Sequence, residues 1–219
     1  MIKRAFDLLA SGLGILLLSP LLGVIAVLVR LDSQGPVLFR QERVGKSGRP
    51  FQILKFRTMR VDAERVGGQL TVRNDPRITG IGRFLRKAKL DELPQLMNVF
   101  RGDMSLVGPR PEVPRYVAMY TPEQRRVLEV PPGITDLASI EFRDENEFLQ
   151  DHDDPETFYV TQIMPKKLEL NLLYLSRRSF VFDLFIIFRT LWRVLLPRQH
   201  GGNKSGLAAE FLQKQRGQE

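Results

Sequence analysis

Cysteine is absent from this chain of 219 residues, and histidine occurs only twice, as His152 and His200. Without cysteine there are no disulfides, no thiolate metal ligands and no thiol nucleophile, which fits a reducing compartment. Two histidines argue against a histidine-based metal cluster and against a Ser-His-Asp triad. The search for chemistry therefore turns to carboxylates and cations.

Several functional motifs are also missing. The chain has no GxxxxGK[ST] loop, no GxGxxG after a strand, no HExxH and no helix-turn-helix pattern. Its basic residues lack the aromatic interleaving that is typical of single-strand nucleic-acid platforms. We therefore expect no nucleic-acid partner.

Positive charge predominates in what is present. The chain has 33 Lys and Arg against 25 Asp and Glu, a formal net charge of +8. Such a surface suits anionic lipid or phosphorylated substrates. The length is enough for one domain with a hydrophobic core, with or without an appendage.

The N-terminal segment is strongly apolar. Residues 8–29 carry no charge, and a continuous helix of that length would span about 33 Å, enough for a bilayer core of about 30 Å. Ser19 and Pro20 lie near its middle, where proline predicts a kink. A kinked spanning helix and a re-entrant hairpin both remain open. Basic residues at both ends favour the hairpin, with both ends on the cytoplasmic side.

A β-hairpin is expected next. Residues 37–40 and 51–56 are β-like, and a link rich in Gly, Ser and Pro joins them. Lys55, Arg57 and Thr58 place two cations and a hydroxyl together at the end of the second strand. A short basic helix is then expected over residues 81–89.

The stretch at residues 83–112 centres on two adjacent carboxylates, Asp91 and Glu92. Leu93 and Pro94 predict a helix start, because proline is tolerated in the first turn. The carboxylates would then lie at or beside the N-cap, where the helix dipole favours negative charge. Taken alone, this stretch is either a capped helix with a basic face or a phosphate-handling site.

The second half of the chain gives coarser expectations. Residues 102–114 contain too much Gly and Pro for regular structure, residues 117–128 favour a helix, and PPGIT at residues 131–135 predicts a turn. An acidic run at residues 144–156 is best interpreted as a solvated loop. Residues 166–195 predict one long amphipathic helix, lying either at a membrane interface or against protein.

Several ordered motifs make the chain similar to the bacterial sugar transferases, the monotopic polyprenol-phosphate phosphoglycosyl transferases. These are the Ser-Pro break at residues 19–20, KFRTM at 55–59, LDELPQ at 90–95, GDMSLVGPRP at 102–111 and PGIT at 132–135. The resemblance covers nearly all of residues 2–196. It departs after PGIT, where the chain has DLASIEFR at residues 136–143, and in the acidic run.

The resemblance implies a mostly helical α+β fold. Residues 1–32 would form a re-entrant membrane helix-break-helix, and residues 33–198 a small cytoplasmic catalytic domain with interfacial amphipathic helices. Beyond the resemblance, the polar composition of residues 199–219 indicates a mobile tail. The protein would lie on the bacterial inner membrane, in contact with membrane lipid, and face the cytoplasm. Nothing in the sequence indicates an oligomeric state.

The resemblance also implies a reaction. A sugar 1-phosphate would pass from a nucleotide sugar, usually a UDP-sugar, to undecaprenyl phosphate, with Mg²⁺ as cofactor, at the first membrane step of surface glycan synthesis. Asp91 and Glu92 would form the catalytic dyad and metal site, with Asp91 the nucleophile in a covalent phosphosugar–aspartyl intermediate. Substrate-binding positions are carried over or suggested at six residues: Lys55, Arg57, Thr58, Arg86, Arg110 and Arg143. The alternatives are a non-catalytic, membrane-anchored basic binding protein and a structural subunit with one spanning helix.

Overall fold

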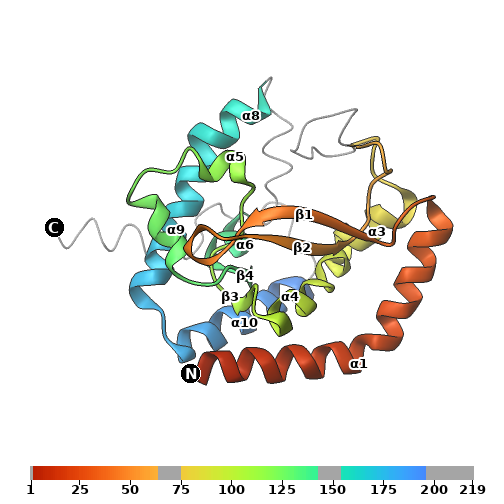
Figure 1. The fold of residues 1–219 in the computed structure, drawn as a ribbon, viewed down its shortest axis with the longest axis horizontal. Coiled ribbons are helices and arrows are strands. Elements are labelled where there is room, and N and C mark those ends of the chain that lie inside the picture. Colours follow the sequence, from red (N-terminus) through yellow and green to blue (C-terminus); the bar gives the residue numbers. More distant parts are fainter. Residues whose placement is uncertain (1, 64–74, 143–153, 196–219) are drawn as a thin grey trace.

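The computed structural model describes residues 2–63, 75–142 and 154–195, and it shows a mostly helical α+β fold (Figure 1). The helices are α1 (Ile2–Asp32), α3 (Gly80–Ala88), α4 (Gln95–Arg101), α5 (Pro114–Val117), α6 (Leu137–Glu141), α8 (Pro155–Phe158), α9 (Met164–Arg177) and α10 (Phe180–Leu195). The strands are β1 (Leu38–Val44), β2 (Pro50–Phe56), β3 (Ser105–Val107) and β4 (Gly133–Thr135). Arg143, the tail and most of the acidic run lie outside the described residues.

The expected hairpin is confirmed. Strands β1 and β2 pair antiparallel, with Leu38 opposite Phe56 and Val44 opposite Pro50. The outer edge of β2 is covered by the side chain of Asn98 on α4. Its Oδ1 accepts from the Leu54 N–H at 3.0 Å, and its Nδ2 donates to the Gln52 carbonyl at 2.8 Å. This buried amide fixes α4 against the hairpin.

Two glycine-rich segments that were expected to be irregular instead form a short parallel pair. Ser105 lies opposite Gly133, and Val107 lies opposite Thr135. The backbones approach so closely that a Cβ on Gly133 would lie 2.1 Å from the Gly108 nitrogen, and one on Gly108 would lie 2.4 Å from the Pro131 carbonyl oxygen. Glycine is needed at these two positions because a side chain would keep the backbones apart, not because a turn requires it.

Helix α1 is continuous across Pro20 and bends sharply near its middle (Figure 1). Proline cannot donate to the carbonyl of Leu16, four residues earlier, and its ring crowds that carbonyl. The hydroxyl of Ser19 donates to the Leu16 carbonyl instead, at 2.8 Å. The Ser-Pro pair thus bends the helix and satisfies the carbonyl that the bend releases.

The two arms of α1 pack on different parts of the domain. The first arm lies under α4, where Gly14 is close to Leu96 and Gly12 is close to Phe100. The second arm packs Ile25 and Val29 into a cluster with Phe56 of β2 and with α3. This cluster is buried, so the second arm of α1 forms part of the domain's hydrophobic core.

The single long helix expected over residues 166–195 is wrong. The chain breaks at Arg178, and α10 begins one residue after Ser179. Ser179 caps the new helix, because its Oγ accepts from the Phe182 N–H at 3.2 Å. The helix expected over residues 117–128, with a restart at residues 121–123, is confirmed only in part: α5 ends at Val117, and a 3-10 helix begins after the restart, at Gln124–Glu129.

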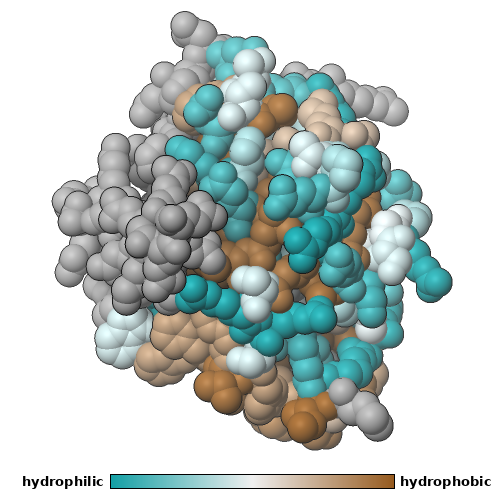
Figure 2. Space-filling model, turned by 90° about the vertical axis from the view of Figure 1, so that its left-hand side faces the viewer, coloured by the Kyte–Doolittle hydropathy of each residue, from teal (hydrophilic) through white to brown (hydrophobic). Residues whose placement is uncertain are grey.

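The exposed apolar side chains concentrate on α1 and α10. In Figure 2 brown atoms gather along the lower edge of the molecule, where Figure 1 places the first arm of α1 and α10. The large exposed residues on α10 are Phe180, Val181, Leu184, Phe185, Phe188, Leu191 and Trp192. By length and composition α1 is, within the described residues, the one helix that could cross a membrane.

Replacing Gly133 with Ala tests the β3–β4 contact. The added Cβ must push the strands apart, so we expect a loss of roughly 1–3 kcal/mol in the free energy of unfolding, as for overpacked cores. The matched control is Gly23→Ala on α1, where a Cβ meets nothing within 4 Å. Unfolding in detergent micelles measures both; equal stability of the two variants would contradict the expectation.

Candidate active site

Asp91 and Glu92 lie in a single 3-10 turn, Leu90–Glu92, between α3 and α4. The turn begins after Lys89, whose backbone is left-handed with φ of 57°. Helix α4 starts later than expected, at Gln95, with Pro94 at the N-cap and no side-chain cap hydrogen bond. The expected capping role of the two carboxylates is therefore wrong, because both stand in the turn before the helix.

Glu92 joins two cations from separate parts of the chain. Lys55 on β2 donates to Glu92 Oε1 at 2.9 Å. Arg110 donates from Nη1 to Oε2 at 3.2 Å and from Nη2 to Oε1, so the pairing is bidentate. Burial acts to raise the pKa of Glu92, but Arg110 and Lys55 outweigh it and hold that pKa well below its ordinary value of 4.5. Glu92 is therefore ionised, and both of its carboxylate oxygens accept hydrogen bonds from cations.

Asp91 has a different environment. It is 8% exposed, and its Oδ1 is buried with no hydrogen-bond partner among the described residues. Burial and the neighbouring Glu92 raise the pKa of Asp91 above its ordinary 3.8, against the pull of Lys55 and Arg86. The nearby cations thus favour the charged form of Asp91, as expected, but burial and Glu92 outweigh them in setting the direction of the shift. Two adjacent carboxylates with opposite pKa shifts are typical of a reaction site.

The remaining substrate-binding positions divide into two groups. Arg86 of α3 interacts electrostatically with Asp91 and donates from Nε to Thr58 Oγ1 at 2.8 Å. Lys55, Arg86 and Arg110 thus bring their charges to the dyad, and Thr58 is bound to Arg86. Arg57 is directed elsewhere: its Nη2 donates to the Ser33 carbonyl at 2.6 Å, at the end of α1. Ser19 and Pro20 form the bend in α1.

Three contacts to the loop around Arg110 were missed from the sequence. Asp136 accepts from the Arg110 N–H at 3.2 Å while capping α6 through the Ser139 N–H at 2.7 Å. Glu112 accepts from Arg43 and from the hydroxyl of Tyr159. Asp136 directly follows PGIT with Ser139 three residues on, a capping signal that could have identified it.

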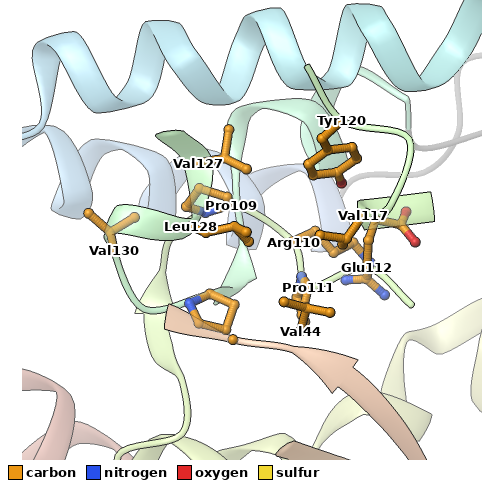
Figure 3. A pocket seen from close by; sticks show the side chains of 12 residues that line it. Val44, Pro109, Arg110, Pro111, Glu112, Val117, Tyr120, Val127, Leu128 and Val130 are labelled. Carbon is orange, nitrogen blue, oxygen red and sulfur yellow. The ribbon is translucent and has the colours of Figure 1, made fainter. Parts of the chain in front are cut away.

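A small pocket lies beside the same loop (Figure 3). Its lining includes Arg110 and Glu112 but is otherwise largely apolar, with Val44, Val117 and Val127 among the walls. Neither Asp91 nor Glu92 lines it. The pocket therefore belongs to the packing behind the loop, and the dyad lies outside it.

The donor set limits how a metal ion would be held. The described residues contain no group of three or more Asp, Glu or His side chains suited to a metal. Glu92 is already bound to two cations, whereas Asp91 has a free oxygen. These residues fit a divalent ion held by Asp91 and mainly by substrate phosphates, the usual arrangement for Mg²⁺.

A carboxylate dyad beside several cations, in a chain with one long apolar helix, is an arrangement that suits the handling of phosphate at a membrane surface. The family model that matches is that of the bacterial sugar transferases, and the match spans residues 1–197. The chain belongs to this family.

Individual relatives give finer names. UDP-glucose:undecaprenyl-phosphate glucose-1-phosphate transferase of Escherichia coli K12 is 40% identical over 202 residues, 88% of this chain and 40% of that protein. UDP-N-acetylgalactosamine-undecaprenyl-phosphate N-acetylgalactosaminephosphotransferase of Aeromonas hydrophila is 40% identical over 199 residues, 89% and 44% respectively. A Caulobacter vibrioides protein with the same name as the first is 39% identical over 193 residues, 86% and 68%. The chain thus spans less than half of the first two relatives.

The opposite pKa shifts of the dyad give opposite effects on stability. Glu92 has a depressed pKa, so it stabilises the fold above pH 4.5, and this contribution is lost as the pH falls below that value. Glu92→Gln should therefore cost roughly 1–3 kcal/mol at neutral pH, because Lys55 and Arg110 lose their partner. Asp91 has a raised pKa, so its charge opposes folding at neutral pH, and Asp91→Asn should be more stable than the parent.

Thermal unfolding of both variants from acidic to neutral pH measures these effects. The difference for Asp91→Asn should vanish below pH 3.8, where both states of the parent carry the proton. A stabilising Glu92→Gln substitution, or a destabilising Asp91→Asn substitution at neutral pH, would contradict the electrostatic assignment.

Proposed function

We propose that this protein transfers a sugar 1-phosphate from a UDP-sugar to undecaprenyl phosphate, releasing UMP and forming undecaprenyl-diphosphate-sugar. The observation that carries the proposal is the buried Oδ1 of Asp91, which has no hydrogen-bond partner among the described residues and lies within electrostatic range of Lys55, Arg86 and Lys89. The names of the family relatives supply the substrate classes and support a place in surface glycan synthesis. Relatives named for glucose and for N-acetylgalactosamine are equally similar, so we name no sugar.

In the proposed first step, ionised Asp91 attacks the β-phosphorus of the nucleotide sugar. A bond forms between its carboxylate oxygen and phosphorus, while the bond from that phosphorus to the bridging oxygen breaks. UMP leaves with the bonding electron pair, and a phosphosugar–aspartyl intermediate remains. The second substrate, a lipid phosphate, then attacks the same phosphorus and restores the free carboxylate.

The surrounding residues prepare this chemistry without reacting. Glu92 holds Lys55 and Arg110 in fixed positions, so these cations need no reorganisation as charge develops on the transferring phosphoryl group. Arg86 approaches Asp91 from α3 and favours its ionised form against burial. When bound, Mg²⁺ would neutralise phosphate charge beside Asp91.

Asp91→Asn tests the nucleophile. The amide cannot form the acyl phosphate, so we expect no turnover and no labelled phosphosugar adduct when polyprenyl phosphate is withheld. The measurement is UMP release across a panel of UDP-sugars with a short polyprenyl phosphate, with and without magnesium, followed by isolation of radiolabelled protein. Asp103→Asn, a carboxylate next to α4 that does not line the dyad, is the control and should retain the adduct.

Two results separate the alternatives. Normal UMP release by Asp91→Asn would refute the nucleophile assignment. Failure of the parent protein to release UMP from any UDP-sugar, together with salt-sensitive binding to anionic lipid, would instead favour the non-catalytic basic binding protein.

We further propose that α1 is re-entrant, with both ends on the cytoplasmic side of the bacterial inner membrane. Two contacts support this. Near the start of α1, Asp7 accepts from the Ser105 hydroxyl at 2.8 Å, and at its end Asp32 accepts from the Ile81 N–H at 3.0 Å. Both partners belong to one domain, which a helix crossing the bilayer could not reach from both ends.

The absence of cysteine makes the topology test direct. Single cysteines placed at Met1 and Ser33 should react alike with a membrane-impermeant thiol reagent in inside-out vesicles and stay protected in right-side-out vesicles. Lys46→Cys in the turn of the hairpin marks the side of the catalytic domain. Opposite labelling of the Met1 and Ser33 positions would establish a spanning helix.

A further inference from the structure

The free edge of strand β3 is held by the first two turns of the membrane helix. On its paired side, β3 runs along β4. On its other side, Asp7 Oδ2 accepts from the Ser105 hydroxyl at 2.8 Å, and Oδ1 accepts from the Leu106 N–H at 3.0 Å. Asp7 is 4% exposed although it stands at the edge of an apolar segment. A carboxylate this buried needs its partners, and β3 provides both.

The end of β3 is fixed in the same way. Lys3, one helical turn before Asp7, donates to the Val107 carbonyl at 3.0 Å and to Asp183 of α10 at 2.6 Å. Tyr174 of α9 donates to the other oxygen of Asp183 at 2.7 Å. Side chains from the first two turns of α1 thus contact β3 at each of its three residues.

Arg110 follows β3 after only two residues. Between them, the Gly108 N–H donates to the Thr135 carbonyl at 3.1 Å, and the Pro109 carbonyl accepts from the Gly133 N–H at 3.0 Å. At Gly108 the two backbones are in close contact, because a Cβ added there would lie 2.4 Å from the Pro131 carbonyl oxygen. This segment therefore has little room to move. A displacement of β3 would therefore also displace Arg110, whose guanidinium binds Glu92.

We propose that Asp7 is a positioning residue for Arg110, through which the membrane helix sets the geometry of the active site. Asp7 touches no substrate in this proposal and acts by fixing the strand that carries the arginine. Its effect on catalysis rests on the function proposed above, whereas its effect on β3 does not.

The other end of α1 offers a matched comparison. Asp32 accepts from the Ile81 N–H at the start of α3, the helix that carries Arg86. Asp32 is therefore a second contact between α1 and the domain, more exposed than that of Asp7, that leads to a different cation. Substitutions at Asp7 and Asp32 should be distinguishable by which arginine they affect.

A double-mutant cycle tests the coupling. Asp7→Ala should lower kcat/KM for UMP release by roughly tenfold to a hundredfold, as for small displacements of a catalytic group. In an Arg110→Lys background the same substitution should change kcat/KM by less than about twofold, whereas independent sites would multiply their effects. The effects of Asp32→Ala and Arg110→Lys on kcat/KM should multiply, as for independent sites. Asp7→Asn should restore most of the activity, because an amide can accept from Leu106 and donate to Ser105.

Amide hydrogen–deuterium exchange in lipid nanodiscs supplies a readout that does not need activity. Asp7→Ala should speed exchange across residues 105–110, and Asp32→Ala should leave that segment protected. Leu9→Ala, at a lipid-facing position that is 73% exposed, should alter neither exchange nor kcat/KM. Unchanged protection of residues 105–110 in Asp7→Ala, or multiplicative effects with Arg110→Lys, would overturn the proposal. An inactive parent with the expected exchange pattern would fault the proposed function alone.

Discussion

The pairing of Glu92 with Lys55 and Arg110 is the interaction on which the rest of the site depends. It joins β2, the 3-10 turn and the loop after β3, three segments that lie far apart in the sequence. Without the carboxylate, two cations would face each other in a largely buried setting, at a high electrostatic cost. With it, they form a prearranged positive wall beside Asp91. Glu92 therefore organises the charges, and Asp91 keeps an oxygen that has no hydrogen-bond partner among the described residues.

Helix α1 contributes to the same arrangement from below. Its start contacts β3, which leads to Arg110, and its end contacts α3, which carries Arg86. Its bend at Pro20 allows one helix to reach both places. Ser19 stabilises the bend, because its hydroxyl donates to the Leu16 carbonyl that proline leaves unpaired. Helix α1 thus supports the elements that carry Arg110 and Arg86, besides presenting an apolar surface.

The sequence reveals local features well and long-range features poorly. The hairpin follows from two β-like stretches joined by turn formers, and the choice of Asp91 and Glu92 as candidates rests on recognisable motifs, all within short stretches. The β3–β4 pair was missed because its glycines serve contact between distant segments. The break before α10 had a signal in Ser179, which caps an apolar run, but the pattern on either side concealed it. The raised pKa of Asp91 arises from burial, which no spacing of residues discloses.

The apolar faces of α1 and α10 lie along one edge of the molecule and have a consequence for how substrates arrive. With that edge immersed in a bilayer, the dyad would stay at one height above the membrane, and the protein could not tumble. In the proposed reaction, the lipid acceptor would then reach the dyad by lateral diffusion in two dimensions, while the water-soluble donor would arrive in three. The two substrates would therefore approach by separate routes.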